Sequence, residues 1–317
     1  MVAEDKTKHY LVGIGKVVLL SLTFGYIFFR LRGVGTEEWQ NFSGIMHSQP
    51  IKTVGILLVA LALAAVNWVL EILKWQRLAS LVSKTDFKSA ARQTLVAFSL
   101  SLATPARAGE YGIKALFFEK AQRKKVMVLH LFSNISQLGI TFLLGLVGLV
   151  FLLKTAHHLF SFEKSLMLLG AMVGFLVFSF LFRKNKIFIR GFNLEALWNF
   201  FAGLPFPVKG IVFLLSLARY VVFSLLFYFL LVFFGMSFDF FSALMLIFSM
   251  YLFVSVVPAF FILDVVIRGG VAVWLFSMFG IPDLTVLSAV GMMWILNFVL
   301  PAILGSFRVF KFQPTRG

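Results

Sequence analysis

Long apolar runs are the feature that most constrains how this chain folds. A helix needs about 20 apolar residues to cross a hydrocarbon core about 30 Å thick. Six runs meet this length: Leu11–Phe29, Thr53–Leu73, Met127–Leu153, Ser165–Phe182, Gly210–Phe234 and Leu284–Leu304. With 60% hydrophobic and 13% charged residues, the chain is predicted to be an all-α polytopic integral membrane protein with six full spans. The polar connections are only loop-sized, so we expect a single transmembrane domain and no soluble catalytic domain.

Two further apolar regions do not read as simple spans. They are Phe87–Phe118 and Phe240–Phe279. As one helix, the second would be about 60 Å long, twice the thickness of the core. Pro105 and Pro258 lie near the middle of the two regions, and proline removes a helical hydrogen bond. Each region is therefore predicted to be a proline-broken helical hairpin that re-enters the membrane on its own side.

The distribution of basic residues predicts the topology. With cytoplasmic termini and two re-entrant hairpins, 19 Lys and Arg lie in cytoplasmic segments and five lie on the opposite side. This excess follows the positive-inside rule, so we expect a multi-pass protein of the inner (cytoplasmic) membrane. The rule also accounts for the net charge of +16 without nucleic acid. Membrane lipids with anionic head groups are the expected partners.

The arrangement of spans repeats within the chain. Each half, about 1–155 and 156–317, has two spans, one broken hairpin and one more span. Three crossings is an odd number, so the second half runs in the opposite direction through the membrane. Inverted-topology repeats of this kind are typical of transporters.

Charged residues follow each proline in the same order. Glu110 and Lys114 stand in the first hairpin, and Asp264 and Arg268 in the second, with the base four residues after the acid in each case. Residues at this spacing share a helix face. Charges among apolar residues usually mark a functional cavity. The alternatives are a structural ion pair in either hairpin and, for the first pair, side chains that reach the cytoplasmic surface.

Arg107 and Arg219 are further candidates for contact with a phosphate, because a guanidinium matches phosphate geometry and stays charged. Each is also compatible with a structural anchor. Glu71, in the sequence NWVLEILKWQRL, is expected instead in an interfacial belt with Trp68 and Trp75 at the cytoplasmic end of its span.

A polar stripe opens the third clear span. His130, Ser133, Asn134 and Gln137 share one helical face. The stripe either borders the same cavity or forms hydrogen bonds between helices.

Catalytic chemistry has little support in the sequence. The chain has no cysteine, and the acids within its apolar segments, Glu71, Glu110 and Asp264, are far apart in sequence. Neither a clustered-carboxylate metal motif nor a glycine-rich phosphate loop is present. We expect no enzymatic activity, no metal and no cofactor.

Three stretches resemble a known family. TPARAGEYGIKALFFEK, residues 104–120, is similar to the TPGR-GE signature of a flippase-like family related to the membrane region of lysylphosphatidylglycerol synthases. LKWQRLASLV resembles the family's RW-x-x-L segment, and VVPAFFILDVVIRGG its later segment. By matching, Arg107, Gly109, Glu110 and Arg268 carry over. The sequence departs from the pattern at Ala106, where the family has glycine, and in reading FFILDVVIRGG instead of Gly-Gly followed by Arg-Glu.

The resemblance implies a protein that moves a lipid, or a lipid-linked group, between leaflets. In bifunctional members a soluble aminoacyl-transfer domain follows this region. Because this chain stops at Gly317, we expect no transferase activity.

Our first hypothesis is a lipid flippase or scramblase-like transporter of an anionic phospholipid or polyprenyl-linked lipid. Lys114, Arg268 and Arg107 would bind the head group, while Glu110 and Asp264 hold these bases or couple transport to protons. The alternative is a non-transporting membrane scaffold, the partner of a lipid- or glycan-modifying enzyme. A third reading, an intramembrane enzyme acting on polyprenyl-linked sugars, lacks a visible catalytic cluster.

Overall fold

The computed structural model describes residues 50–155 and 194–309, apart from residues 103, 105–108 and 257–260, together with a few single positions before residue 50. Side chains at 50–52, 194, 256 and 261–264 are outside this description. The described residues form α3 (Pro50–Ala79), α4 (Phe87–Ser101), α5 (Gly109–Ala115), α6 (Arg123–Thr155), α8 (Leu194–Ala202), α9 (Phe206–Phe233), α10 (Phe240–Val256), α11 (Phe261–Ser277), α12 (Asp283–Trp294), the π-helical turn η3 (Ile295–Val299) and α13 (Leu300–Val309). The structure is thus helical, as the apolar runs predict.

Four helical segments in the described part of the chain are long and apolar enough to cross a membrane. They are Thr53–Ala79, Arg123–Thr155, Phe206–Phe233 and Asp283–Val309. Each contains most of one predicted span, so four of the six spans are confirmed as helices of spanning length. The predicted spans Leu11–Phe29 and Ser165–Phe182 lie outside the described residues, except for Phe29.

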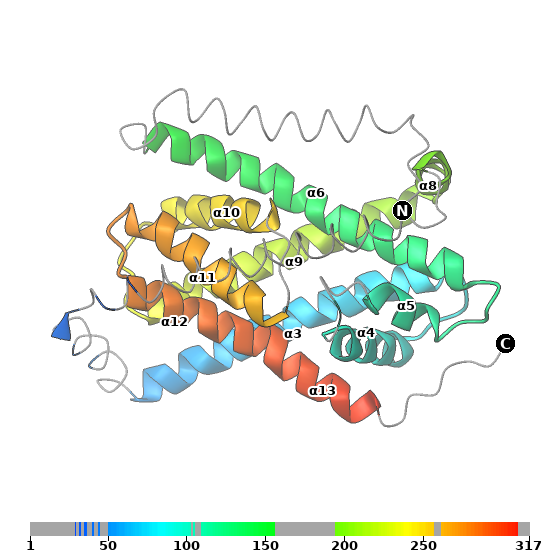
Figure 1. The fold of residues 1–317 in the computed structure, drawn as a ribbon, viewed down its shortest axis with the longest axis horizontal. Helices are drawn as coiled ribbons and strands as arrows, with labels where there is room; N and C mark the ends of the chain where they lie inside the picture. The colour runs from blue at the N-terminus through cyan, green and yellow to red at the C-terminus, as the bar shows by residue number, and fades with distance from the viewer. Residues whose placement is uncertain are drawn as a thin grey trace, which may run out of the picture.

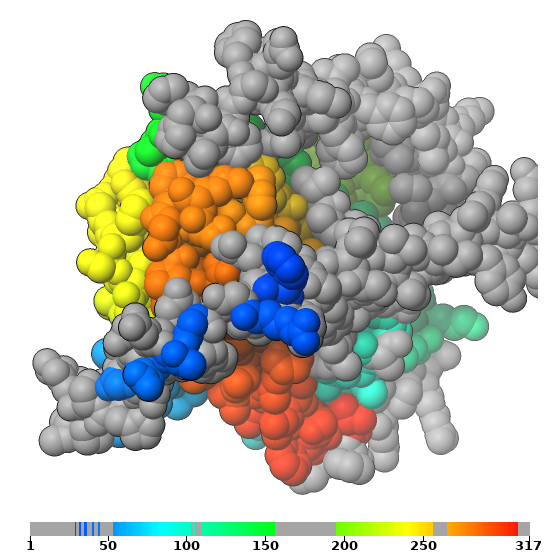
Figure 2. Space-filling model, turned by 60° about the vertical axis from the view of Figure 1, so that its left-hand side comes forward, coloured from blue at the N-terminus to red at the C-terminus, as the bar shows by residue number. Residues whose placement is uncertain are grey.

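The surface of these helices is apolar, as a membrane environment requires. Large hydrophobic side chains such as Leu58, Leu143, Leu214 and Phe307 are more than half exposed. Figure 2 shows α10 and α11 side by side at the surface, with α12 and α13 next to them. The hydrocarbon core has no water to solvate backbone N–H and C=O groups, so an element that faces lipid must pair these groups within itself. Helices meet this condition.

Both proline-broken regions consist of two helices. In the second region α10 and α11 have 17 residues each, or about 25 Å, and the rings of Phe238 and Phe279 contact each other across the outer ends of the pair. Figure 1 shows that α10 starts, and α11 finishes, at the same end of the bundle. In the first region α4 and α5 pack together. The breaks are confirmed, although Pro105 and Pro258 themselves lie outside the described residues.

The two helix pairs lie toward opposite ends of the bundle. Lys125 Nζ donates to Leu81 O at 3.0 Å, which holds the segment after α3 against the start of α6. We call this end, where α3 finishes and α6 and α9 begin, the basic end, because Lys84, Lys88 and Lys124 also lie there. The pair α4–α5 lies toward the basic end, whereas α10–α11 opens at the other end (Figure 1). Such a placement is compatible with an inverted repeat.

Glycine allows a close helix contact in the core. α6 packs along α10, and a Cβ at Gly148 would lie 2.5 Å from Met245 O and 2.8 Å from Ser249 N. A Cβ at Gly145 would lie 2.6 Å from Leu252 Cβ. Small residues of this kind are the usual means by which membrane helices approach each other.

The last span contains a π-helical turn. The backbone N–H of Leu300 bonds to Ile295 O, five residues back. Pro301 has no N–H to donate to the carbonyl of Asn297, so the regular helical ladder is interrupted there. Turns of this type are frequent at functional sites, and this one carries Asn297 into the interior of the bundle.

Candidate substrate-binding cavity

A cavity of about 300 Å³ lies inside the helix bundle. Its lining comes from α3, α4, α5, α6, α9, α10, α11, α12 and η3, so most of the described helices contribute. Four charged residues are part of the lining: Glu71, Glu110, Arg219 and Arg268. Three of them were predicted as site residues, and the tertiary structure brings these three to one cavity.

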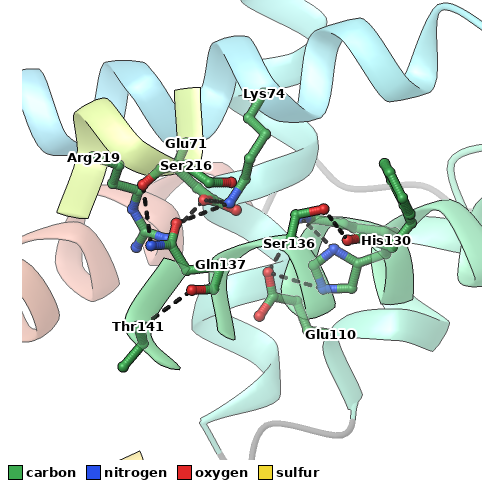
Figure 3. A network of polar contacts seen from close by, with 11 residues as sticks. Glu71, Lys74, Glu110, His130, Ser136, Gln137, Thr141, Ser216 and Arg219 are labelled. Carbon is green, nitrogen blue, oxygen red and sulfur yellow. Dashed lines mark hydrogen bonds and ion pairs between the residues drawn. The ribbon is translucent and has the colours of Figure 1, made fainter. Parts of the chain in front are cut away.

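Glu71 forms the centre of a buried charge cluster. Its Oε2 lies 2.9 Å from Lys74 Nζ, one turn later on α3, and 2.8 Å from Arg219 Nη1 on α9 (Figure 3). Glu71 is 7% exposed and Lys74 is 1% exposed. The predicted interfacial belt is therefore wrong at this position, and Trp75, which is fully buried, does not lie at the lipid surface either.

The sequence held a signal for this burial. Glu71 and Lys74 continue the helical spacing of Ala60, Ala64 and Asn67, all of which are buried. Small and polar residues at i, i+4, i+7 spacing mark the face of a membrane helix that packs against other helices. This face of α3 lies against α9 and α6, so its charged residues face inward.

Gln137 connects this cluster to two other helices. Lys74 Nζ donates to Gln137 Oε1 at 3.4 Å, and Gln137 Nε2 donates to Ser216 O on α9 at 3.3 Å (Figure 3). The side chain of Gln137 thus joins α3, α6 and α9 within the cavity wall.

A second cluster forms around Lys114 on α5. Its Nζ lies 3.2 Å from Glu110 Oε1 and 3.2 Å from His130 Nδ1, and it lies over the Trp75 ring at 4.4 Å from the centroid. Lys114 is fully buried, so the alternative in which it reaches the cytoplasmic surface is wrong. Lys114 supports the cavity from behind Glu110 and is not part of the lining.

The hydrogen bond from Lys114 also shows which ring nitrogen of His130 carries the hydrogen. An ammonium has only donors, so Lys114 donates to His130 Nδ1. A neutral imidazole then carries its hydrogen on Nε2, which lies 3.5 Å from Glu110 Oε1. This distance is too long for a strong hydrogen bond, and Nε2 of His130 has no hydrogen-bond partner among the described residues.

The polar stripe on α6 borders the cavity, as one of its two readings predicts. His130 and Ser133 are buried, while Asn134 and Gln137 belong to the lining. Asn134 Nδ2 also donates to the hydroxyl of Tyr111 at 2.8 Å, so the second reading, hydrogen bonding between helices, holds as well.

Arg268 brings α11, from the second proline-broken region, to the same cavity. It lies on α11, and its guanidinium carbon is 6.0 Å from the centre of the Tyr251 ring on α10. Asp264 belongs to α11, but its side chain is outside the described residues, and so is Arg107. The structure therefore leaves the proposed roles of Asp264 and Arg107 as predictions.

Six buried polar atoms in the lining have no hydrogen-bond partner among the described residues. We call them the unpaired cavity atoms: Asn67 Oδ1, Trp68 Nε1, Thr94 Oγ1, Arg219 Nε, Tyr220 OH and Tyr251 OH. Buried polar groups are normally paired, since an unpaired one costs about 1–3 kcal/mol. Sequence reasoning missed five of these six residues, and only their position within apolar helices signalled them.

The described charges around the cavity are predominantly positive. Two carboxylates, Glu71 and Glu110, face four bases: Lys74, Lys114, Arg219 and Arg268. Lys74 and Lys114 are buried, while Arg219 and Arg268 are partly exposed in the lining. This excess of bases favours an anionic group in the cavity.

The fold and the cavity together define a polytopic helical membrane protein with a charged, polar interior site. The family model described as "Lysylphosphatidylglycerol synthase TM region" matches residues 13–305, and the chain belongs to this family. The resemblance seen in the sequence motifs is thereby confirmed, and the family is a membrane domain with lipid-related functions. Neither the curated proteins nor the solved structures gave a match to this chain.

Proposed function

We propose that this protein is a flippase or scramblase-like transporter that moves an anionic phospholipid or a polyprenyl-linked lipid between leaflets. The observation that carries the proposal is the cavity itself, a space of about 300 Å³ lined by two arginines and two glutamates, inside a bundle of membrane helices. A lipid head group is polar and its tails are apolar. The cavity suits the head group, while the apolar surface of the helices leaves the tails in the bilayer.

Arg219 and Arg268 are the proposed phosphate ligands. Guanidinium groups bind phosphate oxygens through paired, charge-assisted hydrogen bonds. Arg219 is held by Glu71 at 2.8 Å, which fixes the position of the guanidinium. A phosphate in the cavity would compete with this carboxylate for Arg219, so binding and release require only a modest rearrangement.

Lys114 and Glu110 support the site from α5. Because Lys114 is buried against Glu110, His130 and Trp75, we assign it to positioning Glu110 and to the positive potential of the cavity, not to direct contact with the phosphate. This changes the role that the sequence hypothesis assigned to Lys114.

The topology remains part of the proposal. We place the basic end in the cytoplasm, following the positive-inside rule, in the inner membrane. The pairs α4–α5 and α10–α11 then re-enter from opposite sides in two inverted halves, and the cavity lies near the middle of the membrane, where transporters of this architecture bind substrate.

Lipid translocation in proteoliposomes tests the proposed function. The assay follows head-group-labelled anionic and zwitterionic lipids with a membrane-impermeant quencher, and compares the wild type with Arg268→Gln. Arg308→Gln is the matched control, because Arg308 is exposed at the end of α13. We expect Arg268→Gln to slow translocation of anionic lipid about tenfold or more, since one charged hydrogen bond contributes about 1.5–3 kcal/mol, and the control to behave like the wild type.

Two results would contradict the proposal. One is an unchanged rate in folded Arg268→Gln, which would remove this residue from the mechanism. The other is no acceleration by folded wild type with any lipid, which would favour a non-transporting partner of a lipid- or glycan-modifying enzyme. Monodispersity and helical content of each variant show whether it is folded.

A further inference from the structure

The unpaired cavity atoms also specify the chemistry of the head group. We propose that the head group is a phosphodiester joined to a neutral, hydroxyl-bearing group, and that lipids with an amine in the head group are poor ligands. This inference rests on the proposed function, because it assumes that the cavity holds a lipid head group.

Part of the cavity wall can only donate hydrogen bonds. The indole Nε1 of Trp68 and the Nε of Arg219 are donors with no acceptor capacity, and neither has a partner among the described residues. Both atoms therefore require a ligand group that accepts hydrogen bonds and does not itself have to donate one. The oxygens of a phosphodiester are acceptors of this kind.

Another part of the cavity wall can only accept hydrogen bonds. The orientation of the Asn67 amide follows from a chain of hydrogen bonds: Asn297 Nδ2 donates to Met293 O at 3.2 Å, and Asn67 Nδ2 donates to Asn297 Oδ1 at 2.8 Å. Met293 O is a carbonyl and only accepts, so both amides are fixed and Asn67 Oδ1 remains an acceptor without a partner. A phosphodiester has no hydrogen to offer it, and therefore the ligand needs a second group with an O–H or N–H.

The charges decide between O–H and N–H. Glu71 is already paired with Lys74 and Arg219, and Glu110 with Lys114. Among the described side chains of the cavity, each carboxylate is engaged by a base, and bases outnumber acids. A head-group ammonium would enter surroundings that are already positive and would displace a base to find a carboxylate. A neutral hydroxyl avoids this cost.

Three hydroxyls in the wall suit the same ligand. Thr94, Tyr220 and Tyr251 carry hydroxyls without a partner among the described residues, and a hydroxyl both donates and accepts. Such groups pair equally well with phosphate oxygens and with hydroxyls of a polyol. The cavity volume of about 300 Å³ falls at the lower end of the range of small-molecule pockets, about 300–1,000 Å³. The space thus exceeds the need of a phosphate alone.

Two sources supply this chemistry. One is a phospholipid with a glycerol head group, and the other is a polyprenyl phosphate that carries a sugar. Both present a phosphodiester next to neutral hydroxyls, so the lipids in the test are chosen to separate them.

The test measures equilibrium binding to the full-length protein in nanodiscs, followed by intrinsic tryptophan fluorescence and checked by native mass spectrometry. The probes are phosphatidylglycerol, a polyprenyl phosphate sugar, phosphatidylethanolamine and lysylphosphatidylglycerol. We expect one or both of the first two to bind at least tenfold more tightly than the two amine-bearing lipids. Whichever of the first two binds more tightly identifies the source.

Variants locate the binding at the unpaired atoms. Tyr220→Phe and Tyr251→Phe each remove one hydroxyl that makes no described contact, so the fold is retained while the ligand loses a hydrogen bond. We expect binding to weaken about three- to tenfold in each. Tyr228→Phe is the matched control, because Tyr228 packs on the rings of Phe229 and Phe240, outside the cavity.

Specific outcomes would overturn the inference. These are equal or tighter binding of either amine-bearing lipid, unchanged affinity in both tyrosine variants, or no binding of any of the four lipids. If the hydroxylated lipid binds selectively but does not cross the bilayer, the inference stands and the proposed transport fails. If amine-bearing lipids are bound equally well and are moved, transport stands and the inference fails.

Discussion

Arg219 on α9 lies with its Nη1 2.8 Å from Oε2 of Glu71 on α3, and this ion pair joins two membrane-spanning helices inside the protein. Lys74 shares the same carboxylate oxygen at 2.9 Å. One buried carboxylate thus compensates two bases. Since an unpaired charge in such a place is far more costly than a paired one, Glu71 is a structural requirement for the bases as well as part of the cavity wall.

Replacing Glu71 should destabilise the protein strongly. Glu71→Gln leaves Lys74 and Arg219 without a counter-charge, and we expect the free energy of unfolding to fall by about 3 kcal/mol, with partial exposure of Arg219 limiting the loss. Unfolding by SDS titration in mixed micelles measures this change. Glu119→Gln, at an exposed position, is the control and should change the stability by less than about 0.5 kcal/mol. A loss in Glu71→Gln no larger than in the control would contradict the assignment.

Glu110 and Lys114 should behave as a coupled pair. Lys114→Met keeps the length of the side chain but removes the charge that lies 3.2 Å from Glu110 Oε1. We expect each single variant, Lys114→Met and Glu110→Gln, to be destabilised, and the double variant to lose less than the sum of the two. The coupling energy should be about 0.5–3 kcal/mol in a double-mutant cycle. Strict additivity would show that the pair contributes no interaction of its own.

Two glycines of α6 give a direct test of helix packing. In Gly148→Ala the new methyl group meets the backbone of α10 at Met245 O and Ser249 N, and we expect a loss of about 1–3 kcal/mol. Gly139→Ala is the matched control in the same helix, because a Cβ there has no neighbour within 4 Å. Alanine is also the better helix former, so this control should be neutral or slightly stabilising. Equal effects of the two substitutions would contradict the close contact between α6 and α10.

The topology can be tested with single cysteines, since the chain has none of its own. Ser83 lies at the basic end and Ser237 follows α9 at the other end; both are exposed, and serine to cysteine changes only one atom. In right-side-out vesicles a membrane-impermeant maleimide should label Ser237→Cys at once, and Ser83→Cys only after permeabilisation. The reverse pattern would invert the proposed orientation. Labelling of both from one side would refute the assignment of the two ends to opposite faces.

The membrane helices could be predicted because the relevant signal is local. A run such as Thr53–Leu73 contains its own evidence, since its apolar length alone matches a hydrocarbon core. The division of Phe240–Phe279 into two helices was also predictable, because its excess length and the proline near its centre are both visible in the sequence. The turn between α11 and α12 is also marked by residues visible in the sequence: Gly280 adopts φ 72°, and Pro282 directly precedes α12.

The candidate site was only partly predictable. Glu110, Arg219 and Arg268 were selected as charges within apolar segments, and all three line the cavity. Glu71 was misplaced, because a charge near the end of a span and between two tryptophans usually marks the interface. Tyr220, Tyr251 and Asn67 were missed, because a single polar residue in a membrane helix is compatible with many positions around its axis.

By itself, the sequence determined that this chain is a helical membrane protein of a lipid-related family, where its helices lie and where two of its apolar regions break. Only the tertiary structure decided which face of each helix points to the interior of the bundle. It therefore decided that Glu71 of α3, Arg219 of α9 and Arg268 of α11 share one cavity. The physical reason is the range of the forces. The partition of 20 apolar residues into lipid depends on those residues alone, whereas the inward face of a helix depends on partners more than a hundred residues away, through packing and buried ion pairs.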